Sequence, residues 1–268
     1  MSLKYAYLGP AGTFTQAALQ KIAASGDELI PYANVTAALN AVRSGECAKA
    51  LVPIENSVEG VVARTLDELA SGEPLVITAE TTLPVSFSLM TLDKTDIKDI
   101  KSIATHPHAE SQCRSYIAKN FPNAQVIETA STAAAAKGLS KGDYDAAIAA
   151  PIAAKNYQLK VIAEGIGDNT KAVTRFVVVE KPGLIPAATG KDRTSLAVFI
   201  AIDHAGALLE ILNEFAKHQV NLSFIQSRPT GSQLGHYHFI IDTEDILMIS
   251  RLVLPSLGLN KFVRIFVF

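Results

Sequence analysis

The feature that most constrains the fold is an uninterrupted run of apolar, mostly β-branched residues at 173–179, which follows a loop rich in Gly, Asp and Asn at 165–169. A run without alternation of polar and apolar residues is typical of a strand that is buried on both faces of a sheet. Such strands occur in α/β proteins, where helices cover both faces. The run therefore predicts an α/β fold in which residues 173–179 form a buried strand of the parallel type.

Thr174 and Arg175 stand at the start of this run. An unpaired charge beside a buried strand is costly, so Arg175 requires a partner. One alternative is a structural ion pair with Asp168 or a nearby Glu, which is the more common situation for a single arginine. The other is a ligand carboxylate, which the planar donor fork of arginine fits.

Three other apolar runs also end in polar turns that lead into helical patterns, and these turns are 9–15, 55–57 and 105–112. In the first, Thr13 or Thr15 is expected to cap a helix whose free amides and dipole suit an anion. Clefts at the carboxyl ends of parallel strands are common ligand sites. The convergence of the three turns with the start of 173–179 favours a ligand for Arg175.

Each turn has a simpler interpretation when it is taken alone. The turn 9–15 lacks the Lys of a Walker motif and the third Gly of a dinucleotide motif. Asn56 and Ser57 are common capping residues. His106 and His108 flank a proline without a neighbouring Cys, Asp or Glu, which is a poor ligand set for a metal. We therefore expect no metal site.

The composition excludes several classes of protein. The 268 residues suggest about two domains, and the formal net charge of -2 gives no indication of nucleic acid or anionic lipid as a partner. No apolar run reaches membrane-spanning length, and the first residues enter a strand pattern rather than a signal peptide. Cys47 and Cys113 are expected to be reduced thiols. These features predict a cytoplasmic protein without a membrane partner.

The last part of the chain has a different pattern. Pro and Gly punctuate a linker at 183–193, and residues 194–268 follow a βαββαβ order. The expected strands are 195–202, 221–227, 236–242 and 261–268, and the expected helices are 206–217 and about 245–257. No combination of nucleophile and base is visible there, so this part is interpreted as a binding or interaction module.

Together these motifs resemble those of the prephenate dehydratase family with a C-terminal ACT domain. The matching stretches are 8–15, 52–57, 105–107 with Gln112-Cys113, 174–176, 206–208 and 227–229. The resemblance implies a two-lobed catalytic domain similar to periplasmic binding proteins, followed by a ferredoxin-like regulatory domain. The boundaries it implies are a catalytic domain at 1–182 (lobe one about 1–80 and 174–182, lobe two about 81–173), a linker at 183–193 and an ACT domain at 194–268.

The resemblance also implies a reaction, in which prephenate loses carbon dioxide and water to give phenylpyruvate for phenylalanine biosynthesis. Aromatisation drives this lyase reaction, so no cofactor is expected, and the protein has to orient two carboxylates and help the hydroxyl leave. In the family's pattern Thr174 assists the leaving hydroxyl and Arg175 binds a carboxylate. The other substrate-binding residues that the resemblance implies are Thr13, Asn56, Ser57, Thr105, Gln112 and Phe176.

L-Phenylalanine is the allosteric effector that the resemblance implies, and a homodimer or homotetramer is expected because ACT modules have an unpaired sheet edge. The implied effector-binding residues are Gly206, Ala207, Leu208, Gln226, Ser227, Arg228 and Pro229. Three positions depart from the family's pattern: Thr105 replaces a common Ser, Ala172 a common Asn, and Gln226 a common Glu.

Two alternative functions remain open on the sequence. The substrate could be arogenate, whose amino group would require an acidic partner in the cleft. A protein of another class, a non-catalytic amino-acid sensor, could use the same two-lobed architecture. The intact Thr174-Arg175 pair favours an enzyme over a sensor.

Overall fold

The computed structural model describes residues 2–183, 189–200, 204–231, 236–244 and 263–267. Its residues form two compact units, Met1–Val62 with Thr81–Phe176, and Ala63–Glu80 with Val177–Phe268. The lobe and linker boundaries expected from the sequence stay a prediction. The expected helix near 245–257 lies outside the described residues.

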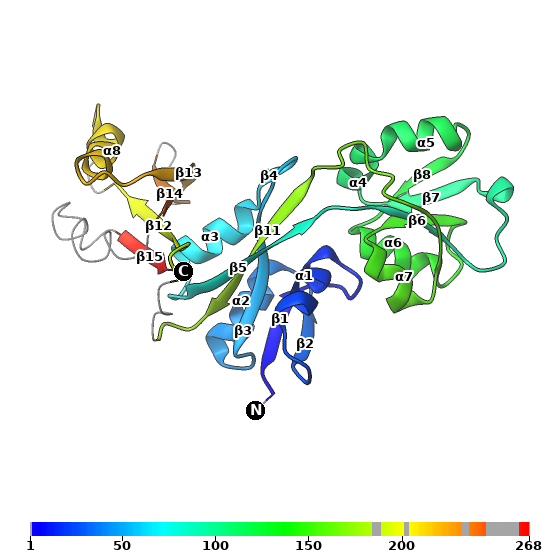
Figure 1. Cartoon of the computed structure of the whole chain (residues 1–268), viewed down its shortest axis with the longest axis horizontal. Helices are drawn as coiled ribbons and strands as arrows, with labels where there is room; N and C mark the ends of the chain where they lie inside the picture. Colours follow the sequence, from blue (N-terminus) through cyan, green and yellow to red (C-terminus); the bar gives the residue numbers. More distant parts are fainter. Residues whose placement is uncertain (1, 184–188, 201–203, 232–235, 245–262, 268) are drawn as a thin grey trace. The chain divides into compact units, whose positions relative to one another are not determined.

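The first sheet has the strand order β2-β1-β3-β11-β5, and β4 pairs with β3. The strands are β1 (Lys4–Leu8), β2 (Glu28–Tyr32), β3 (Lys49–Asn56), β4 (Gly60–Val61), β5 (Val76–Pro84) and β11 (Val173–Glu180). Strand β1 pairs in parallel with β2 and β3, and helices α1 (Phe14–Ile22) and α2 (Val35–Ser44) pack against these strands (Figure 1). All residues of β11 between its two ends are buried, which confirms the expected buried strand.

The sequence also predicts a helix at 61–70 and a strand at 74–80, and both boundaries differ in the structure. The helix is α3 (Ala63–Ser71), because Gly60–Val61 pairs with the end of β3 instead. The strand continues to Pro84 in β5.

The second sheet has the order β10-β6-β9-β7-β8. The strands are β6 (Ser88–Thr91), β7 (Ser102–Thr105), β8 (Gln125–Glu128), β9 (Ala146–Ala149) and β10 (Lys160–Glu164), with the 3-10 helix η1 (Ile97–Asp99) before β7. Strand β7 is parallel to β8 and β9, whereas β6 is antiparallel to β9 and β10. Helix α6 (Thr132–Leu139) packs on this sheet through fully buried alanines, and α7 (Pro151–Tyr157) lies beside it (Figure 1).

The sequence also predicts a single helix at 110–120. That prediction is wrong, because the segment forms two helices, α4 (Pro107–Gln112) and α5 (Arg114–Asn120). Proline at the first helical position sets the early start of α4. The break follows from a tertiary hydrogen bond, since the carbonyl of Gln112 accepts the N–H of Asp168 at 2.6 Å. That carbonyl is thereby used by the loop at 165–169, and Cys113 adopts a non-helical φ of -121°.

The third sheet is antiparallel with the order β13-β14-β12-β15. Its elements are β12 (Arg193–Phe199), α8 (Ala207–Lys217), β13 (Leu222–Pro229), β14 (Tyr237–Glu244) and β15 (Val263–Val267). Helix α8 buries Ile211 and Phe215 against Leu196, Val198 and Ile241 of the sheet. The described elements agree with the expected βαββαβ order, apart from the second helix, which they do not include.

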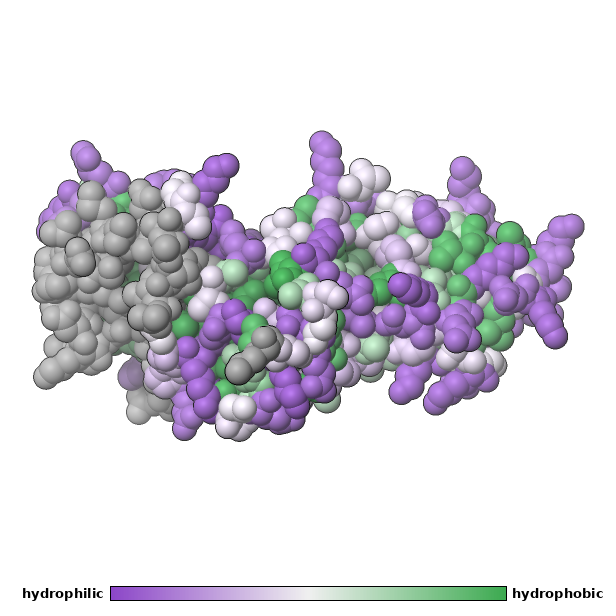
Figure 2. Space-filling view, turned by 60° about the horizontal axis from the view of Figure 1, so that its bottom comes forward, coloured by the Kyte–Doolittle hydropathy of each residue, from purple (hydrophilic) through white to green (hydrophobic). Residues whose placement is uncertain are grey.

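The described surface is mixed in character. On the face that Figure 2 shows, hydrophilic side chains cover much of the described part, with hydrophobic patches between them. Among the residues that the structure describes, no helix is long and apolar enough to cross a membrane. Cys47 and Cys113 are both buried and free, and burial raises the pKa of the Cys113 thiol to about 12.

Asp145 joins two strands of the second sheet. Its Oδ2 accepts the N–H of Lys101 at 3.0 Å, the N–H of Ser102 at 2.9 Å and the hydroxyl of Ser102 at 2.8 Å. These hydrogen bonds lower the pKa of the Asp145 carboxyl below its ordinary value of 3.8. The ionised carboxylate therefore stabilises the junction of β7 with β9.

We expect Asp145→Asn to lower the free energy of unfolding by about 1–2 kcal/mol at neutral pH, because the bonds to a charged acceptor are lost. The pKa of Asp145 is lower in the folded state than in the unfolded state. The extra stability of the wild type over the variant is therefore fully present above pH 3.8, and it disappears as the pH falls through the folded-state pKa. Urea unfolding at about pH 7 and at about pH 3 measures this, with Asp143→Asn as the exposed control. A deficit of equal size at both pH values would contradict it.

Candidate active site

A pocket of about 660 Å³ lies in the first unit. It is lined by the segments that follow β1, β3, β7 and β8, and by the start of β11. Among the sequence-predicted site residues, the structure brings together Thr13, Asn56, Gln112, Thr174 and Phe176. The three polar turns and the start of the buried strand therefore meet at one cavity.

Asn56 makes hydrogen bonds with both ends of its side-chain amide. Its Oδ1 accepts the N–H of Val58 at 2.8 Å and of Glu59 at 3.0 Å, which closes the turn after β3. Because Oδ1 is the acceptor of two N–H groups, the other end is the amide nitrogen. Nδ2 donates to Thr174 Oγ1 at 2.8 Å. The Thr174 oxygen thus receives a proton donor, and its own O–H remains available to donate elsewhere.

Ser57 fixes the same junction without lining the pocket. Its N–H donates to the carbonyl of Val173 at 2.9 Å, and its Oγ accepts the N–H of Val173 at 2.9 Å. This reciprocal pair sets the position of the first residues of β11. Ser57 therefore positions Thr174 from the far side of the turn.

Arg175 and Thr105 lie elsewhere. Successive side chains of a strand point to opposite faces, so Thr174 and Phe176 line the pocket whereas Arg175 between them does not. Arg175 is 8% exposed. Thr105 is fully buried and donates its hydroxyl to the carbonyl of Ile148 at 2.8 Å. Asp168, one suggested partner of Arg175, accepts the N–H of Ser115 at 3.2 Å.

The N-termini of α1, α4 and α6 all reach the pocket, and those of α1 and α6 are capped by hydroxyl side chains. Thr13 is the N-cap of α1, and its Oγ1 accepts the N–H of Gln16 at 3.3 Å, so the N-cap is Thr13 and not Thr15. Ser131 is the N-cap of α6, and its Oγ accepts the N–H of Ala134 at 3.0 Å. The first N–H groups of a helix have no partner within the helix, and together with the dipole they favour an anion. The pocket therefore has positive potential from the backbone.

The turn after β8 is a part of the pocket that the sequence analysis does not predict, and its residues Ala130, Ser131 and Thr132 line the cavity. Its pattern repeats that of the other three turns: strand β8 ends at Glu128, and Ser131 caps the helix that follows. That repetition is the signal that would have identified it.

His106 and His108 also line the pocket. The rings meet edge to face with centroids 4.8 Å apart, and His106 Nδ1 accepts the N–H of His108 at 3.2 Å. Burial lowers the pKa of His106, and His108 adds to this effect, so the His106 ring is neutral at neutral pH. In the described part of the chain, no group of three or more His, Cys, Asp or Glu is arranged to hold a metal ion.

The sequence matches the prephenate dehydratase family over residues 5–183 and the ACT domain over residues 194–253. The chain belongs to the prephenate dehydratase family. A prephenate dehydratase of Amycolatopsis methanolica is 46% identical over 242 residues, which cover 90% of this chain and 79% of that protein.

Two solved structures of prephenate dehydratases are similar over nearly the whole chain. The enzyme of Arthrobacter aurescens in complex with L-Phe has a TM-score of 0.91 at 46% identity, covering 99% of this chain and 89% of that one. The enzyme of Staphylococcus aureus has a TM-score of 0.82 at 27% identity, and the similarity covers 99% of this chain and 100% of that one. These similarities confirm the α/β fold class with a C-terminal ACT domain.

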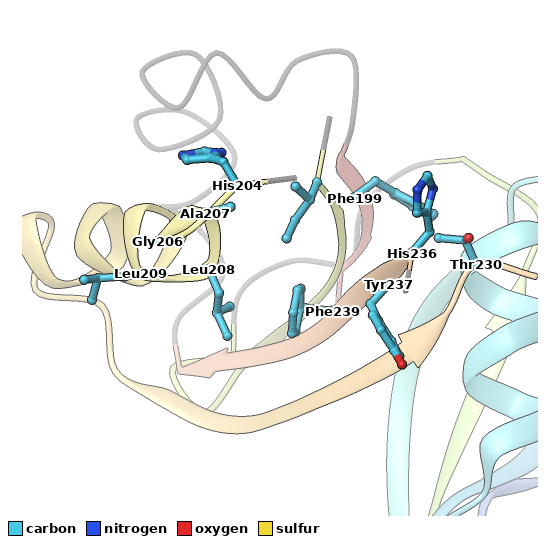
Figure 3. Close-up of a pocket in the computed structure, with 11 residues that line it drawn as sticks. Phe199, His204, Gly206, Ala207, Leu208, Leu209, Thr230, His236, Tyr237 and Phe239 are labelled. Carbon is cyan, nitrogen blue, oxygen red and sulfur yellow. The ribbon is translucent and has the colours of Figure 1, made fainter. Parts of the chain in front are cut away.

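The ACT domain of this prephenate dehydratase family member contains a second pocket of about 500 Å³. Gly206, Ala207 and Leu208 line it, and Leu208 of α8 faces Phe239 of β14 there (Figure 3). Gly206 has a φ of +96° and begins α8 without a side-chain cap. The predicted effector residues of α8 therefore border a cavity.

The other predicted effector residues, Gln226, Ser227, Arg228 and Pro229, belong to β13 and do not line this pocket within one chain. Arg228 makes a bidentate ion pair with Asp67 of α3, with Nε–Oδ1 and Nη2–Oδ2 distances of 2.8 Å. Gln226 Nε2 donates to the carbonyl of Ser227 at 3.0 Å. Whether β13 contributes to effector binding stays a prediction.

The turn after β1 is held by α7. Tyr157 donates its hydroxyl to the carbonyl of Ala11 at 2.7 Å, and Gln16 Oε1 accepts both the N–H of Gly12 at 2.6 Å and Asn156 Nδ2 at 2.7 Å. Gly12 has a φ of +91°, and a Cβ there would lie 3.0 Å from Tyr157 Cε2 and 3.3 Å from Ala153. Both the backbone conformation and the close approach of α7 require glycine.

We expect Gly12→Ala to lower the free energy of unfolding by about 2–3 kcal/mol, from backbone strain and crowding together. Gly26→Ala is the matched control, because Gly26 has a φ of +100° and no atom within 4 Å of a Cβ. The control should lose only about 1 kcal/mol from the positive φ. Denaturant unfolding of both variants measures the difference, and equal losses would show that α7 does not crowd the turn.

Proposed function

We propose that this protein is a prephenate dehydratase, a carbon–oxygen lyase that converts prephenate to phenylpyruvate, carbon dioxide and water. The observation that carries the proposal is the hydrogen bond of Asn56 Nδ2 to Thr174 Oγ1 at the wall of the pocket, in a chain that belongs to this family. The test is incubation of the purified protein with prephenate and detection of phenylpyruvate.

The reaction breaks two bonds that join substituents to the ring. The ring carboxylate leaves as carbon dioxide, the electron pair of its C–C bond enters the ring, and the ring C–O bond breaks with its own pair. The leaving hydroxyl takes up a proton and departs as water. Thr174 supports this step because Asn56 supplies a donor to its oxygen, so the Thr174 O–H can point at the leaving group.

The two carboxylates of prephenate require donors, and the pocket offers them from the N-termini of α1 and α6 and from the amide of Gln112. Arg175 is not among the residues that line the pocket, and its role as a carboxylate ligand stays a prediction. Thr105 and Ser57 support the site as positioning residues through Ile148 and Val173.

We expect Thr174→Ala to lower kcat for prephenate by about 10²–10³-fold with a small change in KM, because the O–H assists mainly the transition state. Thr174→Ser keeps the hydroxyl and should retain much of the rate. Steady-state kinetics of the two variants measures this. Equal losses in both would indicate that the methyl group of Thr174 packs the strand and that its hydroxyl is not used.

Regulation by L-phenylalanine is part of the proposal, because the chain carries an ACT domain and a similar enzyme has been solved in complex with L-Phe. The pocket at Gly206, Ala207 and Leu208 has room for an amino acid and an apolar side for its ring. A homodimer or homotetramer and a cytoplasmic location complete the proposal, and both stay predictions from the sequence.

We expect L-phenylalanine to inhibit the enzyme and Leu208→Ala to raise the concentration for half-maximal inhibition at least about fivefold, since the apolar contact with the ring is lost. Inhibition curves on the full chain measure the shift, with Ile225→Ala as an exposed control outside the pocket. An unchanged curve for Leu208→Ala would place the effector elsewhere.

A further inference from the structure

The pocket has an electrostatic feature that its proposed substrate does not explain. Among the described residues that line it, Glu59 is the one Asp or Glu, and none is Lys or Arg. A carboxylate within a site for a dianion raises the free energy of binding, because like charges repel most strongly in partly desolvated surroundings. Binding of a dianion therefore does not explain why Glu59 lies in the pocket.

Glu59 uses its carboxylate to hold one of the proposed substrate donors. Its Oε1 accepts Gln112 Nε2 at 2.9 Å, and its Oε2 lies 3.7 Å from Nδ1 of His108. Gln112 and His108 both belong to α4 and both line the pocket. A protein carboxylate thus binds the amide that is proposed to bind a substrate carboxylate.

The backbone of Glu59 is fixed, so this placement is built into the fold. Glu59 lies in the short loop between β3 and β4, where Asn56 pairs with Gly60. Asn56 Oδ1 accepts the N–H of Glu59 at 3.0 Å, and Gly60 follows with a φ of +82°. Only the side chain of Glu59, which is 32% exposed, is free to move away from Gln112.

We propose that Glu59 is a specificity-determining residue, whose charge disfavours the keto acid prephenate and favours an analogue that carries an ammonium group at the same place. This inference rests on the proposed function. Glu59 occupies the amide of Gln112, and a substrate carboxylate has to displace it. Prephenate then meets the repulsion of the displaced carboxylate, whereas the ammonium of arogenate forms an ion pair with it.

The charge can be removed with little change in shape. We expect Glu59→Gln to lower KM for prephenate about three- to tenfold with kcat nearly unchanged, because a partly exposed like charge is lost. The same variant should bind arogenate more weakly than the wild type does. This affinity is measured with arogenate as a substrate or as a competitive inhibitor of prephenate turnover. The ratio of the two affinities should therefore shift about tenfold or more toward prephenate.

Two further variants separate charge from geometry. Glu59→Asp keeps the charge but is too short to hold Gln112 at 2.9 Å, and it should retain the wild-type preference between the two substrates. Glu110→Gln removes a carboxylate from the same helix as Gln112, where it binds Arg114 outside the pocket, and it should change neither affinity.

The inference is overturned if Glu59→Gln leaves the ratio of affinities unchanged, or changes both affinities in the same direction and to the same extent. Either result would make Glu59 a structural tie between the β3–β4 loop and α4. The wild-type protein separates this failure from that of the proposed function, because a wild type that converts neither prephenate nor arogenate refutes the function itself.

Discussion

The organisation of the site depends on the side-chain amide of Asn56. This residue lies at the end of β3, and its two polar atoms act in opposite directions: the oxygen closes the turn that carries Glu59, and the nitrogen fixes the hydroxyl of Thr174. A neutral hydrogen bond contributes only about 1 kcal/mol to stability. Its larger effect here is geometric, because it joins two segments 118 residues apart in the sequence and leaves the Thr174 O–H available to donate.

Several other polar contacts support that junction. Ser57 and Val173 form a reciprocal pair beside it, and the carbonyl of Gln112 ends α4 by accepting the N–H of Asp168. The loop at 165–169 and the start of β11 are therefore fixed from two sides before the strand becomes buried. A hydroxyl on a rigid strand can be aimed more accurately than one on a loop, which is what a reaction without a covalent intermediate requires.

The pocket handles negative charge mainly through the backbone. The N-termini of α1 and α6 supply positive potential without the flexibility of lysine or the size of arginine. Arg175 lies on the other face of β11 from the pocket-lining residues. The backbone dipoles are fixed by the fold. The charge of a single acidic side chain such as Glu59 therefore strongly affects which anions the pocket binds best.

The sequence by itself determined the α/β class, the buried strand at β11, the order of the C-terminal strands and three of the four turns that meet at the pocket, because apolar periodicity and capping residues are local signals. Only the tertiary structure decided which side chains enter the cavity. Strand parity turns Thr174 and Phe176 into the pocket and Arg175 away from it, and a hydrogen bond from a distant loop divides α4 from α5. The same holds for Thr105, which the sequence placed in the site and which donates to Ile148 inside the sheet. These outcomes depend on partners far away in the chain, which no local pattern contains.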